Sequence, residues 1–71
     1  MLLHERLKYL RINQNLSQAK LAKDIDVGAR SYQRYEYGDR IPTADIIIKL
    51  AKYFGVSADY LLGLSDDPTR R

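Results

Sequence analysis

The sequence predicts an all-α fold of five short helices. Five segments carry apolar residues at the three- and four-residue spacing of one helix face, and no stretch alternates apolar and polar side chains over the length of a strand. Residues typical of helix starts and ends separate the five segments. The chain has 71 residues and no cysteine, so helix packing alone must stabilise one small domain.

The first helix is expected at residues 2–14, and the sequence 13–15 ends it. Its apolar stripe consists of Leu3, Leu7 and Leu10, which leaves Arg6, Lys8 and Arg11 on other faces. Ser17 is a suitable N-cap for a second helix at residues 18–25. The apolar residues of this helix are Leu21, Ala22 and Ile25.

A connection of three residues, 26–28, leads to a third helix at residues 29–37. Gly38 follows this helix and can adopt the left-handed conformation that ends helices. Two helices joined by so short a turn cross at a large angle, which is the geometry of a helix-turn-helix motif. The small side chain of Ala22 suits the close approach of the two helices.

A fourth helix is expected at residues 44–54 and a fifth at residues 58–62. Their N-caps are Thr43 and Ser57, and their closing glycines are Gly55 and Gly63. The inward stripe of the fourth helix is Ile47, Leu50, Ala51 and Phe54. Residues 1–64 should therefore form the domain, and residues 65–71 should form a frayed polar tail or the start of a linker.

An ordered set of motifs runs along residues 3–63. Its parts are Leu16-Ser17-Gln18, Leu21-Ala22, Tyr32-Gln33-Arg34-Tyr35-Glu36-Tyr37-Gly38, Pro42-Thr43, Lys49-Leu50-Ala51-Lys52 and Gly55-Val56-Ser57-Ala58-Asp59-Tyr60-Leu61-Leu62-Gly63. At these spacings the set resembles the Cro and phage-repressor family of helix-turn-helix regulators. The resemblance implies a lambda-repressor-like fold that binds double-stranded operator DNA as a transcriptional regulator, in most cases a repressor.

The resemblance also implies that the third helix lies in the major groove and reads base edges. The base contacts carried over by position are Gln18, Gly28, Ala29, Arg30 and Arg34. Spacing supports two of these independently, because Arg30 and Arg34 are four residues apart and face away from Tyr32 and Tyr35. An arginine guanidinium can bond guanine O6 and N7 together.

Four further residues are expected to contact phosphates: Ser17, Ser31, Arg40 and Thr43. In the family, an arginine of the first helix pairs with the glutamate that ends the recognition helix, which implies a structural ion pair between Arg11 and Glu36. Two positions depart from the family pattern. Asp26 stands where a left-handed glycine is usual, and Gly28 replaces the usual Ser or Thr cap, so base reading should depend mainly on the two arginines.

Apolar residues outside the inward stripe suggest a weak homodimer on a palindromic operator. The candidates for this interface are Ile48, Tyr53 and Leu62. Tyr37 and Tyr53 should be exposed. Three other tyrosines should belong to the core with their hydroxyls directed outward, namely Tyr32, Tyr35 and Tyr60.

Other functional classes receive little support from the sequence. His4 is the only histidine and cysteine is absent, which argues against a metal site or an enzyme, and no cofactor is indicated. No segment is suited to spanning a membrane, no small-molecule pocket is evident, and a cytoplasmic protein of bacterial or phage origin is expected. The alternatives to a repressor are the DNA-binding partner of a toxin and a protein-interaction module of the same fold.

Overall fold

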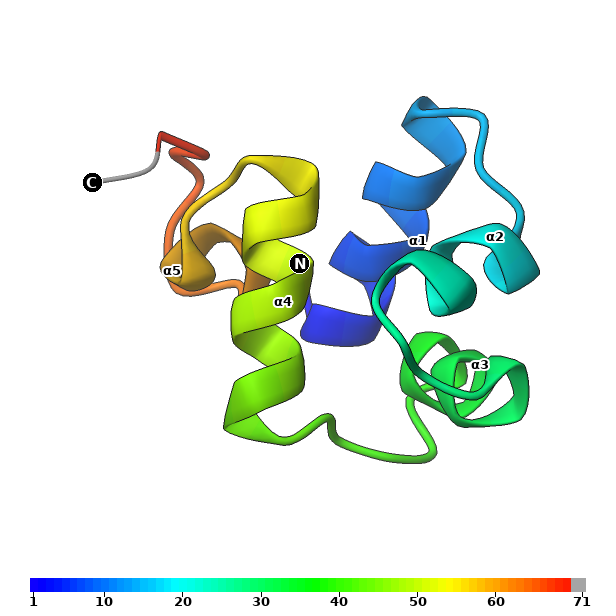
Figure 1. Cartoon of the computed structure of the whole chain (residues 1–71). Helices are drawn as coiled ribbons and strands as arrows, with labels where there is room; N and C mark the ends of the chain where they lie inside the picture. Colours follow the sequence, from blue (N-terminus) through cyan, green and yellow to red (C-terminus); the bar gives the residue numbers. More distant parts are fainter. Residues whose placement is uncertain (70–71) are drawn as a thin grey trace.

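The computed structural model describes residues 1–69 and confirms the all-α fold within them (Figure 1). Its helices are α1 (Leu3–Asn13), α2 (Gln18–Asp24), α3 (Ala29–Tyr37), α4 (Ala44–Phe54) and α5 (Ala58–Leu61). The bounds of α3 and α4 are those predicted. The other helices are shorter than predicted by one residue at one or both ends, where terminal turns commonly fray.

Side-chain caps start three of the helices. The hydroxyl oxygens of Ser17, Thr43 and Ser57 accept bonds from backbone N–H groups three residues further on, at 3.0, 3.4 and 3.0 Å. Helix α1 begins differently, because the N–H of Leu2 donates to Oε1 of Glu5 at 2.8 Å. The predicted caps are thus confirmed.

Two residues in turns adopt the left-handed conformation that the sequence predicts. Gly38 ends α3 with φ of 82°, and Asp26 turns the chain between α2 and α3 with φ of 59°. Asn15 also has a positive φ, of 56°, in the loop that follows α1. Asn and Asp are the non-glycine residues that tolerate this region best, so the turns at Asn15 and Asp26 form without glycine.

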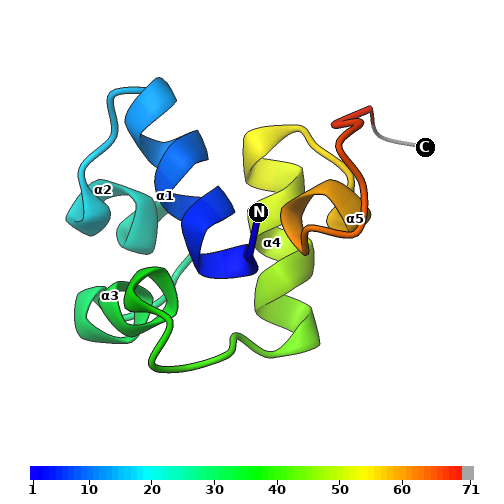
Figure 2. The ribbon, with the colours of Figure 1, turned by 180° about the vertical axis from the view of Figure 1, so that it is seen from behind.

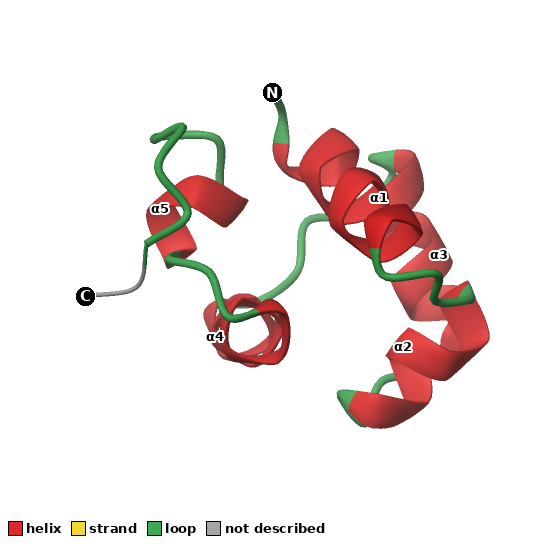
Figure 3. Cartoon of the chain, turned by 90° about the horizontal axis from the view of Figure 1, so that it is seen from above, coloured by secondary structure: helices red, strands yellow, loops and turns green. Residues whose placement is uncertain are grey.

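One core connects all five helices. Each helix supplies one side chain with 0% exposure: Leu7, Leu21, Tyr32, Leu50 and Leu61. Helix α3 packs against α1 and α2, and α5 packs against α4 and α1. Helices α3 and α5 therefore lie on opposite sides of the molecule, with α1 and α4 between them (Figures 1 and 2). Viewed from above, α4 and α5 form one side and the first three helices form the other (Figure 3).

Arg6 is buried, although the sequence placed it outside the apolar stripe of its helix. It is 5% exposed, and its guanidinium carbon lies 3.8 Å from the centre of the Tyr60 ring. Its Nη2 lies 3.7 Å from Oδ1 of Asp66, which is fully exposed. Arg6 therefore joins α1 to α5 mainly by stacking on an aromatic face.

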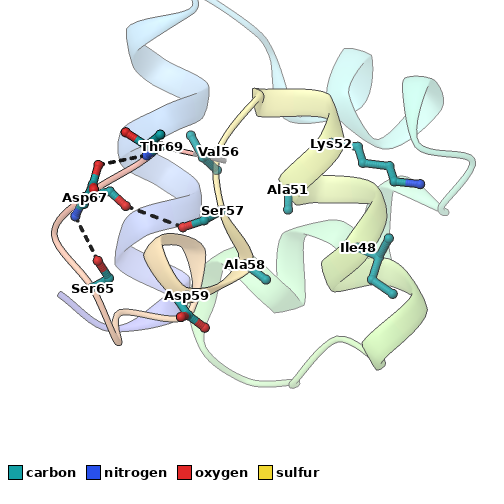
Figure 4. Close-up of a pocket in the computed structure, with 10 residues that line it drawn as sticks. All are labelled: Ile48, Ala51, Lys52, Val56, Ser57, Ala58, Asp59, Ser65, Asp67 and Thr69. Carbon is teal, nitrogen blue, oxygen red and sulfur yellow. Dashed lines mark hydrogen bonds between the residues drawn. The ribbon is translucent and has the colours of Figure 1, made fainter. Parts of the chain in front are cut away.

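Residues 65–69, here called the strap, fold back onto the start of α5. The N–H of Ser57 donates to the carbonyl of Pro68 at 3.0 Å, and the Ser57 hydroxyl lies 3.5 Å from the carbonyl of Asp67 (Figure 4). The prediction of a frayed tail is therefore wrong for the strap. Residues 70 and 71 lie outside the described part of the chain.

The tyrosines are only partly as predicted. Tyr32 and Tyr35 are buried and Tyr60 is half-buried against the core, but the hydroxyl of Tyr32 is buried as well and has no hydrogen-bond partner. Burial and the nearby Glu36 carboxylate raise the pKa of Tyr32 above its usual range. Within residues 1–69 no helix is long and apolar enough to cross a membrane.

Candidate DNA-binding surface

The outward face of α3 is formed by three exposed side chains, Arg30, Arg34 and Tyr37. The opposite face buries Tyr32, Tyr35 and Glu36. Each helical residue turns by about 100°, so the three outward residues, spaced by four and three, share one side. Glu36 is the one carboxylate of α3 and is buried, so the exposed face of this helix carries positive charge alone.

The beginning of α3 is bare. Gly28 is the N-cap and has no side chain to offer, and both Gly28 and Ala29 are exposed. A Cβ added at Gly28 would meet nothing closer than the Ser31 hydroxyl at 3.9 Å. Another backbone can therefore approach this end of the helix closely.

The beginning of α2 adjoins the far end of α3. Ser17 is exposed, Gln18 is half-buried, and both line a hollow of about 470 Å³ that also includes Lys8 of α1 and Tyr37 of α3. The Ser17 oxygen already accepts the capping bond from Lys20, which leaves its O–H proton for an external acceptor. The hollow thus combines an ammonium group and three neutral polar groups with the paired side chains of Arg11 and Glu36.

Arg11 and Glu36 form the ion pair that fixes this arrangement. Nε of Arg11 donates to both carboxylate oxygens of Glu36 at 2.9 and 3.2 Å, and Nη2 donates to Oε1 at 2.7 Å. Nη1 donates to the carbonyl of Leu16 at 2.8 Å. One guanidinium therefore joins α1, the residue that precedes the α2 cap and the last turn of α3.

The ion pair shifts the pKa values of both groups in the direction of the charged forms. The hydrogen bonds to Glu36 raise the pKa of Arg11. Burial is the largest single influence and alone would raise the pKa of Glu36, but the hydrogen bonds and positive charge of Arg11, together with neighbouring polar groups, hold this pKa below its usual range. The pair is therefore fully ionised at neutral pH.

The remaining predicted contacts lie around the two ends of α3. Ser31 is half-buried in the first turn, and Arg40 is exposed beyond the last turn, where its N–H donates to the carbonyl of Arg34 at 3.3 Å. Thr43 is exposed at the start of α4 and is used as a cap. The structure thus brings Gln18 and Ser17 next to the end of α3, with Arg40 beyond it.

Sequence reasoning missed two residues of this surface, Gln33 and Tyr37. Gln33 is half-buried on the side of α3 that carries Ala29, and Tyr37 is 64% exposed and seven residues, about two turns, beyond Arg30. The sequence did contain a signal for both residues. Gln33 follows the predicted contact Ala29 by four residues and Tyr37 follows the predicted contact Arg30 by seven, and both spacings place a residue on the same side of a helix.

Of the three interface candidates, Ile48 and Leu62 are exposed, but Tyr53 is not. Tyr53 is half-buried, and its hydroxyl donates to Oδ2 of Asp24 at 2.6 Å. Nζ of Lys49 also reaches α2, at 3.4 Å from the carbonyl of Ile25. The expectation that Tyr53 is exposed is therefore wrong, because this face of α4 packs against the end of α2.

A basic, exposed helix held against a second helix by a short connection, residues 25–28, defines a helix-turn-helix DNA-binding domain. A family model described as helix-turn-helix matches residues 7–61. The chain belongs to this family, in the branch that contains Cro and the phage repressors.

Individual relatives agree with the family assignment. An uncharacterized HTH-type transcriptional regulator of Bacillus subtilis, YobD, is 41% identical over 90% of this chain and 57% of its own length. The CTXphi transcriptional repressor RstR of Vibrio cholerae is 36% identical over 89% of this chain and 56% of its own length. The chain spans about half the length of these curated relatives. An uncharacterized HTH-type transcriptional regulator of Methanocaldococcus jannaschii is 36% identical over 87% of this chain and 94% of its own length.

The fold also matches a solved repressor. The P22 c2 repressor in complex with a synthetic operator superposes with a TM-score of 0.82 and 29% identity, over 87% of this chain and 94% of that chain. The lambda-repressor-like fold predicted from the sequence is thus confirmed.

Proposed function

We propose that this chain binds double-stranded operator DNA sequence-specifically and represses transcription by occupying the operator. The observation that carries the proposal is the outward face of α3, whose charged side chains are Arg30 and Arg34 and whose one carboxylate is buried in the ion pair with Arg11. A repressor of this kind needs no catalytic step. The names of the relatives and the operator bound to the P22 c2 repressor support the proposal.

In this proposal α3 enters the major groove with its bare N-terminal end first. Arg30 and Arg34 bond guanine edges, and Ala29 contacts the methyl group of a thymine. The absence of side chains at Gly28 allows the start of α3 to approach the base pairs closely. Gln18 adds a base or phosphate contact from the start of α2.

Phosphate contacts on both sides of the groove position the helix without reading sequence. Ser17 and Ser31 supply hydroxyl donors, Arg40 supplies a charged donor beyond the end of α3, and Thr43 adds a hydroxyl at the start of α4. We place this activity in the cytoplasm, where a bacterial or phage operator is accessible.

One recognition helix contacts few base pairs, so two copies on a palindromic site are needed for useful specificity. We infer a weak homodimer in which Ile48 and Leu62 remain candidate contacts. The two half-sites should lie about one DNA turn apart, because two-fold related recognition helices enter successive major grooves on one side of the duplex.

Selection from a random-sequence DNA pool at two salt concentrations tests the proposal. The wild-type chain should enrich a palindrome, and its affinity should fall steeply as salt rises. Arg34→Ala should relax the sequence preference at one base position in each half-site, at a cost of about 1–3 kcal/mol.

Arg40→Ala is the matched control, because it removes an equal charge at a phosphate position. It should weaken binding about equally for all sequences and reduce the salt slope by about 1. Failure of the wild-type chain to enrich any sequence would overturn the proposal, and would favour a protein-interaction module of the same fold.

A further inference from the structure

A groove that the sequence did not indicate lies between α4 and the strap, beside α5. It encloses about 380 Å³, and Figure 4 shows the side chains that line it. Its lining includes Ile48, Ala51, Lys52, Val56, Asp59 and Asp67. Its position on the α4–α5 side separates it from the outward face of α3 (Figures 1 and 3).

The groove has an apolar floor and walls of opposite charge. Ala51 and Val56 form the floor and are buried. One wall is the ridge of α4 that carries Ile48 and Lys52, which are four residues apart and share a helix face. The other wall carries Asp59 of α5 and Asp67 of the strap, and all four wall residues are exposed.

This distribution makes the surface complementary to itself. A ridge with an aliphatic side chain next to a cation faces a groove with an apolar floor and an acidic wall. A two-fold axis brings the same patch of each copy against the other. The α4 ridge of each copy can therefore enter the groove of the other copy, and both contacts form in the same dimer. Any other partner would have to present both an aliphatic side chain for the apolar floor and a cation for the acidic wall.

We propose that this groove binds the α4 ridge of a second copy of the chain. Ile48 packs on the floor of the partner's groove, and Lys52 pairs with the partner's Asp59 and the partner's Asp67. This interface gives a structural basis to the homodimer of the proposed function. It rests on the proposed function in one respect, which is that binding a palindromic operator requires two copies. The contact is small, and a weak dimer results.

The strap gives the proposal a specific structural basis. Asp67 is held in the acidic wall because the Ser57 N–H bonds the carbonyl of Pro68 and the Ser57 hydroxyl lies within 3.5 Å of the carbonyl of Asp67. The N–H of Thr69 bonds Oδ1 of Asp67 at 3.0 Å and the N–H of Asp67 bonds the Ser65 hydroxyl at 3.0 Å (Figure 4). Without these bonds the acidic wall would keep Asp59 of α5 but lose Asp67 of the strap.

Sedimentation equilibrium over a concentration series tests the proposal, with Ile48→Glu as the first variant. A carboxylate at this position enters an acidic groove, so the dimer dissociation constant should rise by about tenfold or more. Ile12→Glu is the matched control, since Ile12 on α1 is 51% exposed and Ile48 is 48% exposed. The control should leave the dissociation constant unchanged.

A charge exchange tests the pairing itself. Lys52→Glu should weaken the dimer, and adding Asp59→Lys and Asp67→Lys to that variant should restore most of the lost affinity. Circular dichroism of each variant verifies that the helices remain folded. A wild-type chain that stays monomeric, an unchanged dissociation constant for Ile48→Glu, or a folded triple variant without recovery would each overturn the inference.

Binding to a DNA fragment that carries one half-site separates this inference from the proposed function. Dimer-defective variants should bind one half-site as well as the wild type does and should lose affinity for the full palindrome. If Ile48→Glu binds the palindrome as tightly as Ile12→Glu, the groove is not the interface, although the DNA-binding proposal survives. If the sedimentation masses of the variants change as expected but neither the wild type nor any variant binds DNA, the proposed function fails and the dimer interface stands.

Discussion

Replacing Glu36 with glutamine should destabilise the domain without changing which bases it reads. Glu36 accepts three bonds from Arg11, and the two side chains are only 2% and 14% exposed. The substitution keeps the size of the side chain and removes its charge. Arg11 then remains in a half-buried site with no counter-ion.

The structure sets the expected magnitude. Removing one partner of a buried ion pair costs about 3–5 kcal/mol. Arg11 keeps its bond to the Leu16 carbonyl and some contact with water, which reduces the loss to about 2–4 kcal/mol. At roughly 4–8 °C of melting temperature per kcal/mol for a domain of this size, the midpoint should fall by about 8 °C or more.

Urea and thermal unfolding measure this loss, with Lys20→Ala as the control. Lys20 also pairs with a carboxylate, Asp24, but its side chain is 59% exposed, so the control should unfold as the wild type does. Combining Arg11→Met with Glu36→Gln should recover part of the loss, because the uncompensated charge is gone. A Glu36→Gln domain within about 0.5 kcal/mol of wild type would refute the reasoning.

The same pair predicts a pH dependence with a defined sign. Burial opposes ionisation of Glu36, but the hydrogen bonds and charge of Arg11 together with neighbouring polar groups favour it, so the pKa of the folded state lies below the unfolded value. The stability that Glu36 contributes is therefore present above about pH 4.3, the ordinary glutamate pKa, and is lost as the pH falls through the folded pKa. The stability gap between wild type and Glu36→Gln should narrow over this acidic range in urea titrations.

Two further substitutions test local features. Gly38→Ala should destabilise the domain more than Gly55→Ala does, because both residues have positive φ but only a Cβ at Gly38 meets a neighbour, the His4 ring at 3.1 Å. Equal unfolding midpoints for the two variants would exclude the His4 contact as a cause. Tyr53→Phe should raise the pKa of Asp24 toward its ordinary value, because the Tyr53 hydroxyl bond is the main reason that this pKa is lowered. Carboxyl chemical shifts recorded against pH measure this change, and an unchanged Asp24 titration would show that the bond is not made in solution.

Local chemistry explains why α3 and α4 were predicted to the residue. A left-handed glycine follows each helix, and Thr43 caps α4, so the ends are determined by neighbours in sequence. The exposed faces followed from helical periodicity, which placed Arg30 and Arg34 away from the core. Helices α1 and α2 have no glycine stop, and α5 ends two residues before its left-handed Gly63, so these helices differ from the prediction by one residue.

Three features that the sequence did not predict, the burial of Arg6, the covering of Tyr53 and the docked strap, depend on contacts between distant residues. Arg6 is buried because Tyr60 of α5 stacks on its guanidinium, and Tyr53 is covered because Asp24 lies opposite it on α2. Helical periodicity contains no information about either partner. The strap is similar, since a short polar segment with a proline is typical of a free tail unless a distant residue such as Ser57 bonds it.

Helix α1 determines how the proposed DNA-reading face and the proposed dimer groove are placed relative to each other. It packs against both α3 and α5, and each contact includes a buried or half-buried arginine. Arg11 holds the last turn of α3 through Glu36, and Arg6 holds α5 through Tyr60. Both arginines project from one rigid helix, so the separation of the two surfaces cannot change without disrupting one of these contacts. In a two-fold dimer this separation determines the distance between the recognition helices, and hence the spacing of half-sites that the protein accepts.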